Sequence, residues 1–298
     1  MNNTGGYEQQ GRRLLGEAES LLESKSGFFA KIFGAQESKV EEAAAKFSEA
    51  GNAFKLAKNF RAAGSAYIRA GECFEQSESS HFEAGSKFLD AAKVLKSVSV
   101  EDAMGALQRA IQLYTLKGRF LQAAKYNKEL AELLEAEGRN EQAILHYEAA
   151  ADLFDGEDAR SHSSGCRVKV AELSALDSKY DVAADLYEQA AVYCLKSDML
   201  RFGAREHLLR AGICRLCLGD DVGSAAAIDR FGSMDASFPS SREGQLLDNL
   251  QRAKEDRNVD DFTEAIFEYD RIMKLDPWKT SILLRLKNSI RSEEEDLT

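Results

Sequence analysis

The sequence predicts an all-α fold: a right-handed α-solenoid of antiparallel, tetratricopeptide-like helix pairs that ends in a C-terminal helical bundle. Three observations lead to this prediction. The 298 residues include only 2 prolines, where about 5 % is usual. A motif of two small residues around a bulky one recurs along the chain, and helix-breaking residues separate its copies at intervals of about 20 residues. A sheet-rich sandwich or barrel does not fit this composition.

The recurring motif reads A-x3-[F/Y/L]-x2-A. Offsets of four and seven place its three side chains on one helix face, where the small residues let a neighbouring helix approach and the bulky one fills the groove. The copies are Ala43-Phe47-Ala50, Ala63-Tyr67-Ala70, Ala84-Phe88-Ala91, Ala103-Leu107-Ala110, Ala143-Tyr147-Ala150, Ala183-Tyr187-Ala190 and Ala204-Leu208-Ala211, with looser copies at Ser164-Val168-Ala171 and Ala265-Tyr269-Ile272.

The breakers mark the ends of the expected helices. Gly and Asn suit the left-handed position just after a helix, and Pro suits the first turn of the next one. We therefore expect some twelve to fourteen helices, stacked as pairs of about 40 residues. The breakers are Asn59, Ser79, Gly118, Gly138, Gly156, Ser178, Gly219, Pro239, Asn258 and Pro277.

No Pro/Ser/Gly-rich linker divides the chain, so we expect a single elongated domain over residues 1–298. Each helix pair in such a stack contacts only its neighbours and leaves an extended surface, which predicts binding rather than catalysis. The expected parts are an N-terminal helix (1–24), a hydrophobic loop (25–36), the helical-repeat solenoid (37–238), the C-terminal helical bundle (239–291) and an acidic tail (292–298).

Charge and cysteine content exclude several classes. The net charge of −11 argues against a nucleic-acid partner, and it is uneven: −2 over residues 1–150 and −9 over residues 151–298. The 5 cysteines are scattered, and no signal-peptide pattern precedes them, which favours a reducing cytosol. No apolar run approaches the ~18 residues that a membrane span needs, so we expect any membrane contact to be peripheral.

Catalytic motifs are missing from the sequence. The 4 histidines form no HExxH pair, and no phosphate-binding G-x-x-x-x-G-K-[ST] or G-x-S-x-G motif occurs. Cys214 and Cys217 form a C-x-x-C inside a helical repeat without a second pair, which we interpret as buried structural cysteine. The sequence therefore predicts a protein that is no enzyme and that uses no metal and no cofactor.

One segment outside the repeat is strongly apolar. Phe28, Phe29, Ile32 and Phe33 lie in a short glycine-bounded stretch, with lysines around them. Such a loop is able to place its aromatic rings in a lipid interface while the lysines meet anionic head groups. The alternative is a hydrophobic staple that folds back on the first helices.

The C-terminal tail is strongly acidic around a single leucine, with Glu294, Glu295, Asp296 and Leu297. An acidic end is commonly just a solvated tail. An isolated leucine among acids also suggests a small docking plug for a partner protein.

Basic side chains gather in the first two thirds of the chain. Several occupy corresponding places in successive repeats, so they would form a stripe that meets an acidic, rod-like partner. Ordinary solvated helix surface is the alternative for part of them. The candidates are Lys55, Lys58, Arg119, Lys125, Arg167, Lys169, Arg201 and Arg205.

Short motifs spread over nearly the whole chain resemble one known family. They are Gly27-Phe28-Phe29, Ile32-Phe33-Gly34, Ala53-Phe54-Lys55-Leu56-Ala57-Lys58-Asn59-Phe60, Ile111-Gln112-Leu113-Tyr114, Gly118-Arg119-Phe120, Ala123-Ala124-Lys125, Lys169-Val170-Ala171, Asn258-Val259-Asp260, Trp278-Lys279-Thr280, Leu283-Leu284-Arg285 and Glu294-Glu295-Asp296-Leu297. In this order they resemble the soluble NSF attachment proteins. Retention of both the aromatic loop and the acidic end favours the alpha and beta types over the gamma type.

The resemblance implies an adaptor that coats the four-helix SNARE bundle after membrane fusion, in several copies, and recruits the hexameric ATPase NSF, the N-ethylmaleimide-sensitive factor. NSF supplies the ATP chemistry, and the adaptor stimulates it. The implied location is the cytoplasm, with peripheral attachment to membranes in vesicle-mediated transport.

The resemblance also implies roles for single residues. Phe28 and Phe29 match the family's membrane loop, and Lys125 matches a lysine that faces the SNARE bundle. In the acidic half, Glu255 and Asp256 match residues that face the NSF N-domain. The penultimate leucine needed to stimulate the ATPase is matched by Leu297.

Two positions depart from the family pattern. Gly165 stands where a second SNARE-facing lysine is expected, so Arg167 or Lys169 would have to substitute. Arg252 stands where an acidic NSF-facing residue is expected. From the repeat alone, the competing function is a generic helical-repeat scaffold that binds peptide tails or partner helices; a third class, an enzyme on such a scaffold, lacks catalytic residues in the sequence.

Overall fold

The computed structural model describes residues 4–23 and 35–295, and over these ranges the protein is all-α. They form 14 α-helices and one short 3-10 helix, and no strand occurs among them. The prediction of an all-α fold built from antiparallel helix pairs is confirmed. Contacts divide the chain into two compact units, residues 1–160 and 161–298, which are taken in turn.

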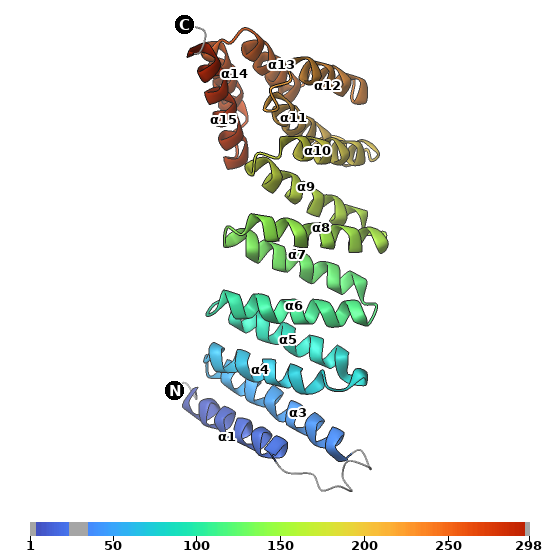
Figure 1. Ribbon diagram of the computed structural model, residues 1–298, viewed down its shortest axis with the longest axis vertical. Coiled ribbons are helices and arrows are strands. Elements are labelled where there is room, and N and C mark those ends of the chain that lie inside the picture. The colour runs from blue at the N-terminus through green and yellow to red at the C-terminus, as the bar shows by residue number, and fades with distance from the viewer. Residues whose placement is uncertain (1–3, 24–34, 296–298) are drawn as a thin grey trace. The chain divides into compact units, whose positions relative to one another are not determined.

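In the first unit each helix packs antiparallel on the next, so alternate turns lie at the same end of the helices (Figure 1). Its elements are α1 (Thr4–Glu23), α3 (Ala35–Leu56), α4 (Phe60–Phe74), the 3-10 helix η1 (Glu78–Ser80), α5 (His81–Leu95), α6 (Val100–Leu116), α7 (Phe120–Ala136) and α8 (Asn140–Gly156).

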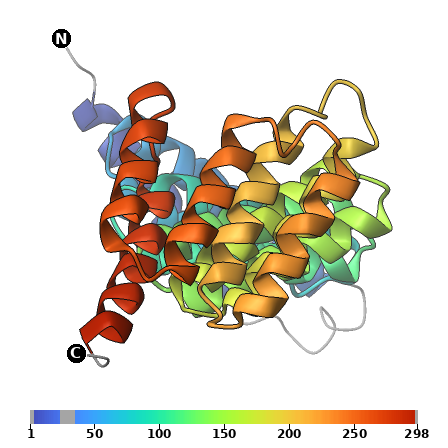
Figure 2. The same cartoon turned by 90° about the horizontal axis from the view of Figure 1, so that it is seen from above.

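The second unit begins with further antiparallel helices and ends in the predicted bundle. Seen from above, its orange and red C-terminal helices lie side by side (Figure 2). Its elements are α9 (Arg160–Leu176), α10 (Tyr180–Leu195), α11 (Gly203–Leu216), α12 (Asp221–Met234), α13 (Arg242–Glu255), α14 (Val259–Ile272) and α15 (Pro277–Glu295). The last helix continues into the segment that the sequence analysis assigned to the tail.

The helices of both units pack against one another through the residues of the recurring motif. All seven full copies are buried at all three positions. Small residues bring the helices so close that a methyl group added at Gly64 would lie 2.4 Å from the Leu95 side chain. This close packing explains why small residues recur at fixed offsets in the sequence.

The two looser copies agree with the structure only in part. In α9, Ala171 is buried as predicted, whereas Ser164 and Val168 are only half-buried and their neighbours Ser163 and Cys166 are buried instead. In α14, Tyr269 is buried but Ile272 is 61 % exposed. This helix buries only Phe262 and Tyr269, because an outer helix needs a single narrow apolar stripe.

The breakers fall at turns, but their roles differ in part from the expectation. Gly118, Gly138 and Gly219 adopt the left-handed conformation, as predicted. In contrast, Asn59 and Asn258 cap the following helices through their side-chain oxygens, and the residue before each of them takes the positive φ. Gly156 stays in α8, and the left-handed residue of that turn is Asp158.

A buried polar network fastens α15 to the helices of the second unit. The Arg210 guanidinium of α11 forms ion pairs with Glu172 of α9 at 3.1 Å and with Asp276 at 2.8 Å, just before α15. The indole N–H of Trp278 donates to the Glu172 carbonyl oxygen at 3.1 Å. Residues about 100 positions apart are thereby joined, and the C-terminal helix has a fixed place in its unit.

Candidate interaction surfaces

The predicted membrane loop lies outside the residues that the structure describes. This holds for Phe28, Phe29, Ile32 and Phe33, and also for Asp296 and Leu297 at the other end. The backbone of Glu294 and Glu295 belongs to α15. Roles for all of these residues stay predictions.

In the first unit, the predicted basic residues lie at two different ends of the helices. Lys55 lies in the last turn of α3, and Lys58 lies in the turn that follows; both are exposed. Arg119 precedes α7 in the turn at the opposite end, and Lys125 lies within α7; these two are also exposed. The structure therefore brings Arg119 and Lys125 onto one helix but does not bring Lys55 and Lys58 to them.

In α9, Lys169 lies four residues after Gly165, so the two positions share a helix face, whereas Arg167 lies only two residues after Gly165. The substitution of either residue for the expected lysine stays a prediction. Gly165 is exposed and has open space around it. The Lys169 ammonium pairs with the Glu172 carboxylate at 2.9 Å, which limits the directions in which it presents its charge.

A second basic cluster of this unit surrounds the start of α11. The Arg205 guanidinium donates to the Ser237 hydroxyl at 2.9 Å and lies 3.9 Å from the buried Asp235 carboxylate. Burial opposes ionisation of Asp235, but hydrogen bonds from Ser237 and the charges of Arg201 and Arg205 outweigh it and lower its pKa. Arg205 is thus held in place by a charged partner, and Arg201 is exposed.

The predicted NSF-facing acids adjoin a groove between α13 and α14. Glu255 and Asp256 are exposed at the end of α13. The groove has a volume of about 360 Å³. Its lining residues are Asn249, Arg252, Ala253, Asp256, Asp261, Glu264, Ala265 and Glu268.

The sequence analysis missed the acids that α14 adds to this groove. Asp261, Glu264 and Glu268 are spaced by three and four residues, so they share one face of the helix. That spacing was the signal available in the sequence. The Arg252 guanidinium, which departs from the family pattern, pairs with Asp248 at 2.8 Å. Its positive charge is thereby offset, and the surface keeps its acidic character.

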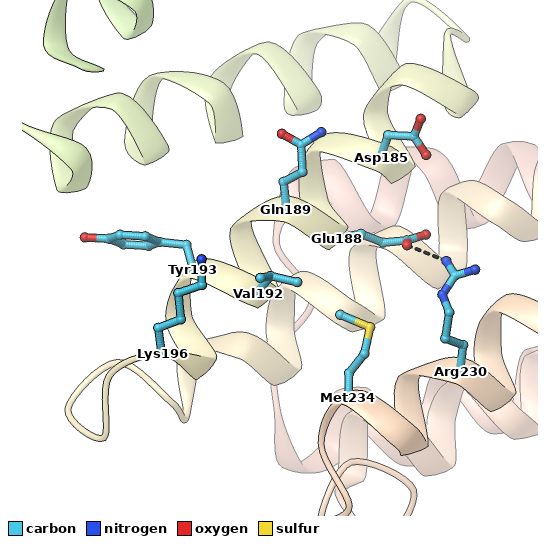
Figure 3. Close-up of a pocket in the computed structure, with 8 residues that line it drawn as sticks. All are labelled: Asp185, Glu188, Gln189, Val192, Tyr193, Lys196, Arg230 and Met234. Carbon is cyan, nitrogen blue, oxygen red and sulfur yellow. Dashed lines mark hydrogen bonds and ion pairs between the residues drawn. The ribbon is translucent and has the colours of Figure 1, made fainter. Parts of the chain in front are cut away.

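A larger groove of about 620 Å³ runs between α10 and α12 (Figure 3). Three of its charged side chains form ion pairs: Glu188 contacts Arg230, and Glu188 and Asp185 both contact Arg215. The remaining lining residues are Gln189, Val192, Tyr193, Lys196 and Met234. Nothing in this lining combines a nucleophile with a base, so the groove offers no catalytic arrangement.

Burial shifts the pKa of several cysteines and histidines. It raises the pKa of Cys217 to about 12 and that of Cys214 further. Burial lowers the pKa of His146 and of His207, with the Arg210 charge adding to the effect at His207. Residues 4–23 and 35–295 contain no cluster suited to a metal ion. Over the same residues no helix has the length and apolar character of a membrane span.

Known proteins are similar to this chain along nearly its whole length. The family model "Soluble NSF attachment protein, SNAP" matches residues 9–291. The human alpha-soluble NSF attachment protein is 39 % identical over 298 residues, all of both chains. Its counterpart from Dictyostelium discoideum is 41 % identical over 292 residues, 98 % of this chain and 99 % of the relative. Vesicular-fusion protein SEC17 of Komagataella phaffii is 31 % identical over 296 residues, 97 % of this chain and 99 % of the relative.

These names associate the relatives with NSF attachment and vesicle fusion. The family match covers both compact units, and with them the basic residues of α7 to α11 and the acidic groove of α13 and α14. The chain belongs to the soluble NSF attachment protein family.

Proposed function

We propose that the protein is an adaptor in SNARE complex disassembly. It binds the post-fusion SNARE four-helix bundle, recruits the NSF hexamer and stimulates its ATPase, in the cytoplasm and at membrane surfaces. The observation that carries this proposal is full-length identity of 39–41 % to alpha-soluble NSF attachment proteins. The charge distribution supports it, since the net charge is −2 over residues 1–150 and −9 over residues 151–298.

The SNARE bundle is bound by exposed cations of α7 to α11. Lys125 and Arg119 carry unburied charges in the first unit, and Arg201 does so in the second. Exposed ion pairs contribute only about 0–1 kcal/mol each. Each copy of the adaptor therefore binds weakly and with strong salt dependence, and several copies act together on one bundle.

The NSF side is the acidic surface of α13 and α14 with the C-terminal tail. Glu255 and Asp256 form its centre, and the acids of α14 extend it along the groove. Loop residues Phe28 and Phe29 add a peripheral membrane contact, which raises the local concentration of the adaptor where SNARE complexes reside.

The test measures ATP hydrolysis and SNARE disassembly by purified NSF with a preformed SNARE complex, with and without the protein and at two salt concentrations. We expect stimulation that requires the SNARE complex and decreases at high salt. A Lys125→Glu variant should weaken SNARE binding about tenfold because it replaces attraction by repulsion. Lys93→Glu, an exposed lysine of α5, is the matched control.

Two outcomes would contradict the proposal. If the protein did not stimulate an NSF from the same source, the competing function, a generic helical-repeat scaffold, would replace the proposed one. Equal effects of the Lys125 and Lys93 variants would remove Lys125 from the SNARE-binding surface.

A further inference from the structure

One serine of the C-terminal helix has an acidic residue at each of the four positions that follow it. Ser292 precedes Glu293, Glu294, Glu295 and Asp296, and no other serine or threonine of the chain is followed by such a run. A kinase whose substrate cleft is basic selects a hydroxyl group in this kind of sequence, because its cations pair with the carboxylates after the serine. The sequence around Ser292 thus has the chemistry of a substrate for an acidophilic serine kinase.

The structure leaves the Ser292 hydroxyl accessible. The side chain is exposed in the last turn of α15, and its hydroxyl donates to the Ser289 carbonyl oxygen at 2.9 Å. This hydrogen bond is local to the turn, so a water molecule is able to replace the carbonyl when the turn unwinds. The hydroxyl therefore faces solvent rather than a neighbouring helix.

The end of α15 is able to unwind without exposing the core. Ile290 is buried in the apolar core of the second unit, whereas Arg291 and Ser292 after it are exposed. A substrate hydroxyl has to enter the kinase active site and approach the γ-phosphate of ATP, so the residues around it leave their helix. Helix ends with few buried contacts open at low free energy. Ser292 meets this requirement because it follows the last anchor of α15 that the structure describes.

A second serine with acids after it shows how the structure distinguishes between sites. Ser99 precedes Glu101 and Asp102 by two and three residues, but it is half-buried and its hydroxyl caps α6 by accepting from the Asp102 amide at 3.4 Å. The Glu101 carboxylate forms an ion pair with Arg139. A kinase would have to break both contacts at the start of a packed helix, so we expect Ser99 to remain unmodified.

A phosphate on Ser292 would present its charge to a partner. It adds about −1.5 to −2 charges at pH 7. The side chains one turn earlier on the same face belong to Asn288 and Ser289, so those positions supply no cation to neutralise it. The C-terminal end of the helix dipole is itself negative and does not bind the phosphate. Its charge is therefore available to a basic surface outside the chain.

We propose that Ser292 is a phosphorylation site for an acidophilic serine kinase, and that the phosphate strengthens the contact with NSF. The kinase, with Mg²⁺ and ATP, transfers the γ-phosphoryl group to Ser292. The bond from the γ-phosphorus to the oxygen that bridges it to ADP breaks, a bond from that phosphorus to the Ser292 Oγ forms, and ADP and the hydroxyl proton are released.

The regulatory part of the inference rests on the proposed function, which assigns the acidic surface of α13 and α14 and the C-terminal tail to NSF. A partner that binds an acidic surface presents a basic one. The phosphate adds charge of the same sign as Glu255 and Asp256 to this side of the adaptor, so it increases the attraction between the two proteins.

The first experiment measures phosphate transfer to the full-length protein. Purified casein kinase 2, an acidophilic serine kinase, is supplied with Mg²⁺ and ATP labelled at the γ-phosphate. The variant is Ser292→Ala. The matched control is Ser289→Ala, because Ser289 is also an exposed serine of α15 and also donates to a carbonyl oxygen three residues earlier, but no acid follows it directly. Circular dichroism verifies that both variants are folded.

We expect the parent and the Ser289→Ala control to incorporate the label equally, and the Ser292→Ala variant to incorporate none. Mass spectrometry of peptides should locate the phosphate on Ser292 and find Ser99 unmodified. A parent that takes up no label would overturn the inference, and so would a Ser292→Ala variant that takes up as much label as the parent.

The second experiment measures the concentration of adaptor that gives half-maximal stimulation of the NSF ATPase with a preformed SNARE complex. Phosphorylation should lower this concentration about threefold at low salt, since exposed charges contribute modestly, and the difference should disappear at high salt. Ser292→Ala treated with the same kinase should not change. An unchanged or higher concentration for the phosphorylated parent would overturn the regulatory part.

Failure of the proposed function is distinguishable from failure of this inference. A parent that stimulates no NSF would contradict the proposed function and the regulatory part with it. Incorporation of the label requires no NSF, so it decides by itself whether Ser292 is a phosphorylation site.

Discussion

At the residue scale, the effect of a substitution on stability depends on which atoms surround the substituted position. The residue types that are exchanged matter less. Gly64 and Gly105 are both helical glycines of the first unit. A methyl group at Gly64 would collide with Leu95 at 2.4 Å, whereas nothing lies within 4 Å of one at Gly105. Identical changes at the two positions therefore have opposite effects on stability.

Gly105→Ala should raise the free energy of unfolding by about 0.5–1 kcal/mol, because alanine restricts the unfolded chain and favours the helix. Gly64→Ala should lower it by about 1–3 kcal/mol through overpacking. Urea unfolding followed by circular dichroism measures both. Changes of the same sign at the two positions would contradict the close approach of α4 and α5.

A half-buried histidine makes stability depend on pH. The pKa of His207 in the folded protein is lowered below the value of about 6.5 in the unfolded chain, by burial and by the Arg210 charge. The unfolded state therefore binds more protons as the pH falls below about 6.5. Stability is full above that value and is lost below it, at a rate of at most about 1.4 kcal/mol per pH unit for this group.

Replacement of the imidazole should remove this dependence. We expect His207→Gln to show a smaller loss of unfolding free energy between pH 7.5 and 5.5 than the parent, because glutamine takes up no proton. Urea titrations at several pH values measure the slope. An unchanged slope would mean that His207 is not the group that titrates.

At the element scale, α15 is held by contacts from helices far away in the sequence. Arg210 of α11 is only 13 % exposed at its side chain and binds Glu172, Glu206 and Asp276. Burial opposes ionisation of Asp276, but the Lys279 amide and the charges of Arg210 and Lys279 outweigh it and lower its pKa. Two cations, Arg210 and Lys279, therefore hold α15 among several acids.

Arg210→Met should destabilise the protein by about 1–3 kcal/mol, since it removes the largely buried guanidinium that joins three acids. The acids are only half-buried and keep their ion pairs with Lys169 and Lys279. Arg271→Met is the matched control on α14. It removes an exposed pair with Glu268 and should cost about 0–1 kcal/mol. Guanidinium unfolding measures both. Similar losses in the two variants would show that the Arg210 network contributes no more than a surface ion pair.

At the scale of the whole molecule, the proposed adaptor separates its binding functions along the chain. Basic side chains for the SNARE bundle lie in α7 to α11, and acidic ones for NSF lie in α13, α14 and the tail. The formal charge is −2 over residues 1–150 and −9 over residues 151–298, so the acidic excess lies in the half of the chain that contains α13 and α14. A change at one end should therefore leave binding at the other end intact.

Leu297→Ala tests this separation. We expect it to leave SNARE binding unchanged while it lowers the SNARE-dependent ATPase rate of NSF several-fold, because a docking leucine stimulates NSF after the complex has formed. The matched control is Leu284→Ala, an exposed leucine of α15. Unchanged ATPase stimulation by the Leu297 variant would remove the docking role of the tail.

The sequence by itself determined the helices, their order and the faces that they bury. It did so because a helix face repeats every three to four residues, so the motif around Phe47 or Tyr147 identifies a buried stripe without knowledge of its partner. Family membership followed from motifs in a fixed order. The same periodicity in α14 contained the acids of the groove, which the sequence analysis missed.

Only the tertiary structure decided which surfaces meet. Periodicity does not show which helix covers a stripe, so the register of α9 and the ion pairs of Arg210 with residues 38 and 66 positions away were beyond the sequence. The antiparallel stacking decided that Lys55 and Arg119 lie at opposite ends of their helices. The physical reason is that contacts between distant segments depend on packing and not on local spacing.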